Sequence, residues 1–176
     1  MPENLGNLKG LKNLSLSGTT IKDLPLSIEG LIALTLLTLN DCENLVCLPS
    51  TICSLNLLEC LDLFGCLNCD NLPEILGNLK GLKKLYLTGK TINELPSSIE
   101  DLTALTFLTR KDCKNLVCLP STIFCSKLLE CLDLSRCSNC EILPEKLGNF
   151  NGLKFLYLSG TSTKELPSLI EGFTAL

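Results

Sequence analysis

An internal repeat constrains this chain more than any other feature of its sequence. Three segments resemble one another closely: LGNLKGLKNLSLSGTTIKDLP from Leu5, LGNLKGLKKLYLTGKTINELP from Leu76 and LGNFNGLKFLYLSGTSTKELP from Leu147. The copies begin 71 residues apart, and self-similarity at a fixed period is the signature of repeat architectures. The chain is therefore expected to fold as a row of similar units, each packed against its neighbours.

A shorter unit, L-x-x-L-x-x-L-x-L-x-x-T/C, recurs within each copy every 23 or 24 residues. This spacing falls in the range of about 20–29 residues that is typical of leucine-rich repeats. An L-x-L alternation predicts a short strand with leucines on one side, and stacked units would place these strands in a parallel sheet. The pairs are Leu14 and Leu16, Leu37 and Leu39, Leu61 and Leu63, Leu85 and Leu87, Leu132 and Leu134, and Leu156 and Leu158, while Leu108 is followed by Arg110 in the fifth unit.

The segments between strands carry a Leu-Pro step followed by an isoleucine, as in DLPLSIEGL and ELPSSIEDL. Proline suits the first position of a helical turn. A serine followed three residues later by glutamate, as in Ser97 with Glu100 and Ser168 with Glu171, is expected to form a capping box. The sequence thus predicts an α/β solenoid over residues 1–176: an arc of about seven leucine-rich repeats with a parallel sheet on the concave face and short helical or 3-10 turns on the convex side.

The twelve cysteines follow the repeat. One position, three residues after the last strand leucine, holds a small residue with a donor group that can bond to loop carbonyls. This structural slot is occupied by Thr19, Cys42, Cys66, Cys113, Cys137 and Thr161.

Two C-x-x-C pairs, Cys66 with Cys69 and Cys137 with Cys140, have the spacing of zinc ligands. They lie three units apart, which corresponds to three strand spacings of about 4.8 Å, whereas a zinc–sulfur bond is about 2.3 Å. One shared tetrahedral site is therefore excluded. We expect these cysteines to be structural thiols, and we expect no metal ligands among them.

The sequence has few of the features expected of an enzyme or of a nucleotide-binding site. Histidine is absent, which removes the commonest general base and metal ligand. The TGKT of Thr88 to Thr91 lacks the first glycine of a phosphate-binding loop, because that position is Lys84. Asp62 and Asp133 are three units apart and cannot act on one bond. We expect no enzyme activity, no catalytic residues and no cofactor in this segment.

Charge and hydropathy limit the partners and the compartment. A net charge of −4 and a pI near 4.9 argue against a nucleic-acid surface, which is usually basic. No apolar run is long enough to span a membrane, and the N-terminal sequence does not resemble a signal peptide. Cysteines kept as thiols fit a reducing, cytoplasmic setting.

If the leucines of each L-x-L pair point inward, the residues around them point outward in columns across the sheet. Aromatic and charged side chains on a rigid surface are typical of binding hot spots. The candidates for protein binding on the concave face are Asp62, Phe64, Lys84, Tyr86, Thr109, Lys111, Asp133 and Tyr157.

Some units depart from the pattern. Arg110 replaces an inward leucine and Lys90 takes a Thr/Cys slot. An unpaired buried charge is costly, so Arg110 is expected to snorkel to the surface, shift the local register or weaken its unit. Both ends begin or stop within a unit and show no polar cap, so the chain is expected to be part of a longer protein.

The units LKGLKNLSLSGTTIKDLPLSIEGL and LLECLDLFGCLNCDNLPEIL resemble the leucine-rich repeats of plant intracellular nucleotide-binding disease resistance proteins, most of all those with an N-terminal Toll/interleukin-receptor domain. The resemblance implies a role in sensing pathogen effectors and restraining a nucleotide-driven switch. The partners it implies are proteins: an effector, a guarded host protein or the receptor's own switch domain. ADP or ATP would bind only to a nucleotide-binding domain attached elsewhere.

Two other classes remain open from the sequence alone. A stand-alone cytosolic scaffold would bind proteins on the same face without an attached switch. A thiol redox or metal-binding protein would need accessible cysteines of low pKa.

Overall fold

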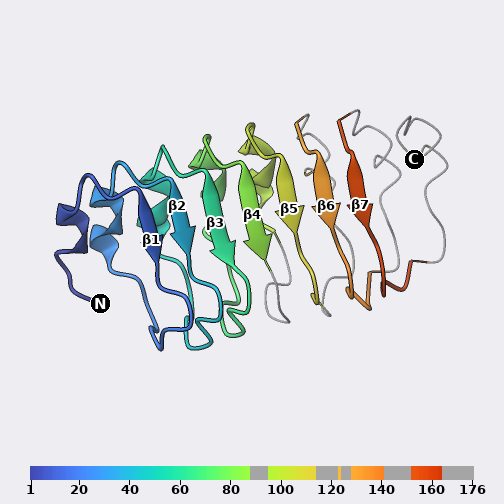
Figure 1. The fold of residues 1–176 in the computed structure, drawn as a ribbon, viewed down its shortest axis with the longest axis horizontal. Helices are drawn as coiled ribbons and strands as arrows, with labels where there is room; N and C mark the ends of the chain where they lie inside the picture. Colours follow the sequence, from blue (N-terminus) through green and yellow to red (C-terminus); the bar gives the residue numbers. More distant parts are fainter. Residues whose placement is uncertain (88–94, 114–122, 124–127, 141–151, 164–176) are drawn as a thin grey trace.

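A computed structural model of the chain describes residues 1–87, 95–113, 123, 128–140 and 152–163. These residues form one seven-stranded parallel sheet in which the strands follow one another in chain order, and Figure 1 shows them side by side along the long axis of the molecule. The predicted leucine-rich-repeat solenoid is confirmed. The strands are β1 (Asn13–Ser15), β2 (Leu36–Thr38), β3 (Cys60–Leu63), β4 (Lys84–Leu87), β5 (Phe107–Thr109), β6 (Cys131–Asp133) and β7 (Phe155–Tyr157).

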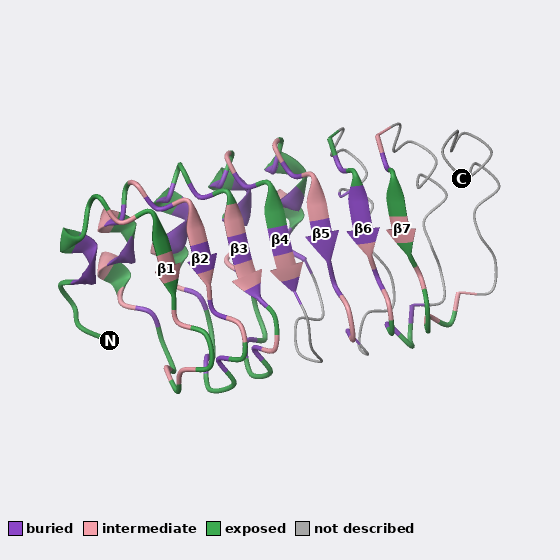
Figure 2. Cartoon of the chain, viewed as in Figure 1, coloured by how far each residue is buried: buried purple, intermediate pink, exposed green. Residues whose placement is uncertain are grey.

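The strands pair in register without a slip. Asn13 pairs with Leu36, Leu36 with Cys60 and Cys60 with Lys84, and the same row continues to Phe155. Each repeat unit therefore contributes one strand at an equivalent position. The central leucines of β2 to β6 are fully buried, as Figure 2 shows by the change of colour along each strand.

Short 3-10 helices precede strands β1 to β5 in turn: η1 (Leu5–Asn7), η2 (Leu26–Gly30), η3 (Ser50–Ser54), η4 (Leu76–Asn78) and η5 (Ser97–Asp101). In a 3-10 helix, residues three apart lie on the same side. Ile28 is therefore aligned with Leu31, and both are fully buried. Ile52 and Ile99 repeat the arrangement, which explains the Leu-Pro-x-x-Ile pattern as the apolar edge of a helical turn.

Two details of the helix starts differ from the sequence prediction. Pro96 lies at the N-cap of η5 with an extended backbone (φ −60°, ψ 148°), one residue before the expected first helical position. Ser97 is therefore inside the helix, and no side chain caps this end. The predicted capping box of Ser97 and Glu100 is wrong, because that motif needs the serine in the extended cap position which the proline occupies. The second predicted box, Ser168 with Glu171, lies outside the described residues.

The cysteine slot joins neighbouring units. The thiol of Cys42 donates to the Leu16 carbonyl at 3.0 Å, that of Cys66 to the Leu39 carbonyl at 3.1 Å, and that of Cys137 to the Arg110 carbonyl at 2.8 Å. Each bond crosses from one unit to the carbonyl of the residue that directly follows the preceding unit's strand. These three thiols thus donate to carbonyls at the strand ends of the neighbouring unit.

Threonine in the same slot behaves differently. Thr19 donates to the Leu16 carbonyl at 2.7 Å and Thr161 to the Leu158 carbonyl at 2.9 Å, in both cases within their own unit. Their hydroxyls therefore close the turn after the strand, whereas the thiols of Cys42, Cys66 and Cys137 tie one turn to the next.

Two of the three outcomes expected for Arg110, snorkelling to the surface and a shift of the local register, are contradicted, whereas a weakening of its unit stays a prediction. The side chain is fully buried and does not snorkel to the surface. The register is also unbroken around it, since Leu108 pairs with Leu132 and the Arg110 amide donates to the Asp133 carbonyl at 2.8 Å. The backbone of the fifth unit follows the repeat because its hydrogen bonds do not depend on the side chain. Lys90, the other departure, lies outside the described residues.

Candidate functional site

The outward side of strands β1 to β7, here called the sheet face, carries the predicted central column. Ser15, Thr38, Asp62, Tyr86 and Thr109 are direct neighbours on successive strands, and the column continues through Asp133 to Tyr157. Neighbouring strands are about 4.8 Å apart. The fold thus places side chains that are far apart in sequence in one continuous row.

The two aspartates of this column also shape the strand ends. The Asp62 carboxylate accepts a hydrogen bond from the Phe64 amide at 2.9 Å, and Asp133 accepts one from the Ser135 amide at the same distance. Burial raises the pKa of the Asp62 carboxyl, and the charge of Asp41 acts in the same direction, although the Phe64 amide opposes both. One oxygen of each aspartate is therefore committed to the turn that follows its strand.

Thr109 is a correction to the predicted binding surface. It occupies the expected position in the column, but only 6% of it is exposed. Its hydroxyl accepts a hydrogen bond from the Lys111 amide at 3.3 Å, so it plays the same turn-forming role as the aspartates. Thr109 offers a partner almost no surface. This burial could not be predicted from the sequence, because the outward position alone does not reveal how far larger neighbours cover a short side chain.

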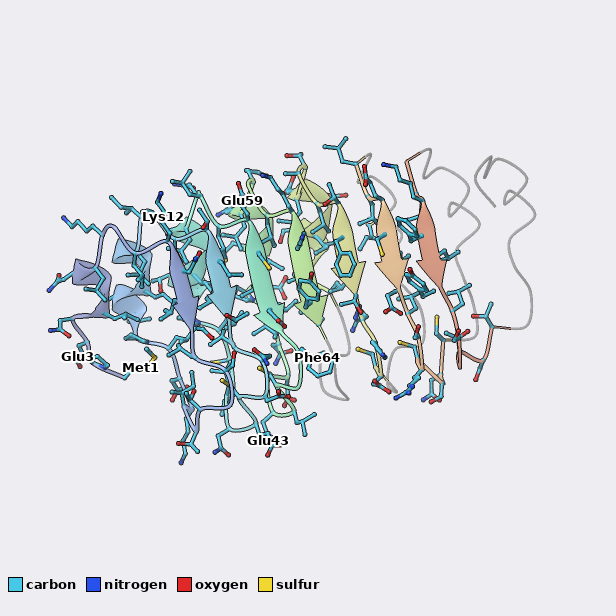
Figure 3. The ribbon with its side chains drawn as sticks, viewed as in Figure 1. Met1, Glu3, Lys12, Glu43, Glu59 and Phe64 are labelled. Carbon is cyan, nitrogen blue, oxygen red and sulfur yellow. The ribbon has the colours of Figure 1, made fainter. Side chains whose placement is uncertain are left out.

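The remaining candidates are accessible to different degrees. Tyr157 is 47% exposed and Phe64 is 45% exposed, whereas Tyr86 and Lys111 are half-buried. Figure 3 labels Glu59 where the chain enters β3 and Phe64 where it leaves, at opposite ends of the strand. The sheet face therefore has aromatic surface both at its centre and at the edge where the strands end.

An aromatic pair stiffens the middle of the sheet face. The rings of Tyr86 on β4 and Phe107 on β5 lie with their centroids 4.9 Å apart and their planes at 37°. Contacts of this kind hold large side chains in place. The pair forms a ridge, with Lys84 exposed beside it.

A hollow lies on each side of this ridge. The first, of about 300 Å³, has Cys60 between Leu36 and Lys84 in one cross-strand row, with Tyr86 along its side. A short side chain between two longer ones leaves space above it. The cysteine is therefore the reason for the hollow.

The second hollow repeats the first after 71 residues. It measures about 350 Å³, and Cys131 lies in its row between Phe107 and Phe155, with Tyr157 along its side. Phenylalanines thus replace Leu36 and Lys84 of the first hollow, so the second is the more aromatic. Lys84 lines both hollows.

Some charges at the entrance to the strands form ion pairs. Lys83 contacts Glu59 at 2.8 Å and Lys154 contacts Glu130 at 2.9 Å, and all four side chains are about half exposed. Within the described ranges, no ion pair involves Lys84. Its ammonium group faces solvent between the two hollows and is available to a partner's carboxylate.

The cysteines have the properties of structural thiols. Burial raises the pKa of the Cys53 and Cys69 thiols to about 11 and that of Cys66 to about 12, and a hydrogen bond with Cys113 raises the pKa of Cys137. Since the thiolate is the reactive form, such groups are poor nucleophiles at neutral pH. No cluster of three or more metal-binding side chains occurs in the part of the chain that the structure describes.

The sequence predicted the columns of outward-facing side chains but not the two hollows. Cys60 and Cys131 begin their strands and form the floors of the two hollows. A signal was present: in the row before the central column, a cysteine stands between larger residues in both copies of the 71-residue block.

The TGKT segment lies outside the described residues. None of the helices in the described ranges has the length and apolar character needed to cross a membrane.

Two models of known protein families match parts of the chain. A family model described as leucine-rich repeats of disease resistance protein RPS4B-like matches residues 54–128. A second model, described simply as Leucine Rich Repeat, matches residues 128–150.

Curated proteins from plants resemble most of the chain. TMV resistance protein N of Nicotiana glutinosa is 36% identical over 180 residues, covering 100% of this chain and 16% of its own length. Disease resistance protein RPS4B of Arabidopsis thaliana is 39% identical over 133 residues, covering 76% of this chain and 11% of its own length. The chain therefore spans only a small part of these relatives.

Solved structures share the fold. The leucine-rich-repeat domain of the type III effector XopL matches with a TM-score of 0.77 and 26% identity, covering 99% of this chain and 70% of that domain. A leucine-rich-repeat protein of Leptospira interrogans matches with a TM-score of 0.76 and 24% identity, covering 100% of this chain and 50% of that one.

Proposed function

Because the chain belongs to the leucine-rich-repeat family, in the group found in plant disease resistance proteins, we propose that it is the protein-recognition module of a plant innate immune receptor. In this role it senses a pathogen effector or a guarded host protein, or it contacts the receptor's own switch domain. Binding then either releases or maintains the restraint on that switch. Recognition requires no bond-breaking chemistry in this segment.

The sheet face is the structural feature that supports the recognition role. Seven strands in register hold its side chains on a rigid surface, so that a partner meets them without a large ordering cost. The face combines exposed aromatic rings, two hollows and an exposed cation. Aromatic side chains and desolvated pockets are the usual centres of binding energy in protein interfaces.

The charge and the thiols are consistent with this role. A net charge of −4 does not favour nucleic acid as the partner. Most of the described cysteines are buried, and Cys47 is the exposed one among them. A thiol redox role needs accessible thiols, and few are present in the described residues. We assign the working location of the module to the cytoplasm, and the binding of ADP or ATP to a separate nucleotide-binding domain of the receptor.

Binding measurements on the purified chain test the proposal. The chain is immobilised and exposed to a panel of purified pathogen effectors and to nucleotide-binding domains of plant disease resistance proteins, with ADP and ATP as further analytes. We expect saturable binding to at least one protein of the panel and no binding of either nucleotide. Nucleotide binding by this chain, or the absence of any protein partner across a broad panel, would contradict the proposal.

A further inference from the structure

We infer that the two hollows act together, and that they bind an extended protein segment with two large apolar side chains four residues apart and a carboxylate midway between them. The inference rests on the proposed recognition function and specifies the chemistry of the partner.

The spacing follows from the duplicated block. The floor residues Cys60 and Cys131 lie in the same cross-strand row, on β3 and β6. Three strand spacings of about 4.8 Å separate them by about 14 Å. An extended chain advances about 3.3 Å per residue and points alternate side chains to the same side. Residues i and i+4 of a segment that crosses the strands are therefore about 13 Å apart and face the sheet together.

The apolar residues of the lining favour apolar side chains at these two positions. Leu36 borders the first hollow, and Phe107, Phe155 and Tyr157 border the second. Phe155 is 52% exposed, so a large apolar side chain seated beside it would remove this apolar surface from water. The more aromatic second hollow favours an aromatic residue.

Charge complementarity specifies the residue between them. Lys84 lies on β4 in the same row as the two cysteines and lines both hollows. Lys83, next to it in the chain, and Lys154, which precedes β7, form ion pairs with Glu59 and Glu130, whereas Lys84 is exposed and takes part in none of the ion pairs of the described residues. Residue i+2 of the segment faces the sheet as well, so a glutamate or aspartate there meets the Lys84 ammonium.

Three synthetic nonapeptides test the spacing and the charge. SGFSESFGS has phenylalanines four residues apart with glutamate between them, SGFSEFSGS brings them to three residues, and SGFSKSFGS replaces glutamate by lysine. Titration of the whole chain, followed by NMR shifts of its aromatic resonances, is expected to show at least tenfold tighter binding of the first peptide than of the other two. Equal binding of all three, or binding of none, would overturn the inference.

Variants of the chain assign the effect to these residues. Lys84→Glu is expected to reverse the preference between the glutamate and lysine peptides, while Lys9→Glu, the same charge change at an exposed site remote from the hollows, leaves it unchanged. Cys131→Leu should weaken the first peptide at least fivefold by filling the second hollow; Leu36 shows that leucine is accommodated in this row. Thermal melts confirm that each variant is folded. No response to either substitution would contradict the assignment.

The failure of this inference can be told apart from failure of the proposed function. If a protein partner binds the sheet face but the nonapeptides do not discriminate, the segment chemistry is wrong and the recognition role stands. If light scattering instead shows that the chain dimerises and that Lys84→Glu abolishes the dimer, the occupant is a second copy and the inference is overturned. If neither peptide nor protein binds, both proposals fail.

Discussion

At the scale of single residues, the repeat fixes the backbone more firmly than it fixes the side chains. Arg110 occupies a leucine position, is fully buried and yet leaves the register unchanged. Thr109, its neighbour, takes the predicted outward position but is covered. The sequence therefore predicts where a residue lies in its unit, whereas its accessibility depends on the size of side chains on adjacent strands.

Replacing Arg110 with leucine is expected to stabilise the chain. The guanidinium is removed from water in the folded state, which costs free energy that a leucine at the same position does not incur. We expect the free energy of unfolding to rise by about 1–3 kcal/mol, measured by urea denaturation. Lys9→Leu, which removes a charge at an exposed position, should change it by less than about 0.5 kcal/mol. An unchanged or lower stability of Arg110→Leu would show that the arginine is well accommodated.

The buried thiols predict a loss of stability in alkali. The pKa of Cys66 is raised by burial from 9.0 to about 12, so the folded state holds its proton at pH values where the unfolded chain releases it. The contribution is fully present below about pH 9 and is lost as the pH rises toward 12. The melting temperature at constant ionic strength should fall over this range, and it should fall less in Cys66→Thr, because threonine has no group that titrates there. Identical alkaline profiles for the two proteins would refute this account.

At the scale of elements, the 3-10 helices set how closely the units approach. Gly77 in η4 lies against η5: its amide donates to the Ser98 hydroxyl at 3.0 Å, and a Cβ on Gly77 would collide with the Ser98 backbone carbonyl. The sequence shows this glycine as a repeated letter of LGN. Its reason, a close approach of two backbones, becomes visible only in the structure.

Gly77→Ala should accordingly be destabilising. The added methyl group must push η4 away from η5, and overpacking of this kind costs about 1–3 kcal/mol. Gly10→Ala is the matched control, since nothing lies within 4 Å of a Cβ at Gly10. Chemical denaturation of both variants measures the difference. Equal effects of the two substitutions would mean that the helices separate at little cost.

The starts of these helices mark where sequence patterns mislead. A serine and a glutamate three residues apart predict a capping box, but Pro96 already occupies the cap of η5. The Leu-Pro-x-x-Ile pattern is the better guide because it encodes burial: Ile28, Ile52 and Ile99 are all within the core. Apolar periodicity predicted the elements, whereas the local capping chemistry was set by the competing residue next to it.

At the scale of the whole molecule, the solenoid divides its stability among neighbouring units. Leu37 on β2 is fully buried between two strands, while Leu14 on β1 is only partly buried, because β1 has a strand on one side only. The periodic leucines predicted the row of strands and its register. They could not predict the hollows, which depend on which side chains meet across strands β2–β4 and β5–β7.

Hydrogen exchange should reveal this gradient. The Leu16 amide donates to the Thr38 carbonyl and the Leu39 amide to the Asp62 carbonyl, both at 2.8 Å, so the two bonds are matched in length. We expect Leu16 to exchange faster, because the terminal unit opens with fewer contacts to break. Equal protection of the two amides would indicate that the chain unfolds as one cooperative block.

The central claim is that the sheet face is the recognition surface, and the most direct measurement is the affinity of two matched triple variants for one protein partner. The first variant alters the face: Lys84→Glu, Phe155→Ala and Tyr157→Ala. The second makes the equivalent changes at exposed residues outside it: Lys9→Glu, Leu26→Ala and Ile32→Ala. We predict that the first variant loses at least a hundredfold in affinity, about 2.7 kcal/mol, and that the second binds like the unaltered chain. Equal losses, or a loss confined to the second variant, would contradict the claim.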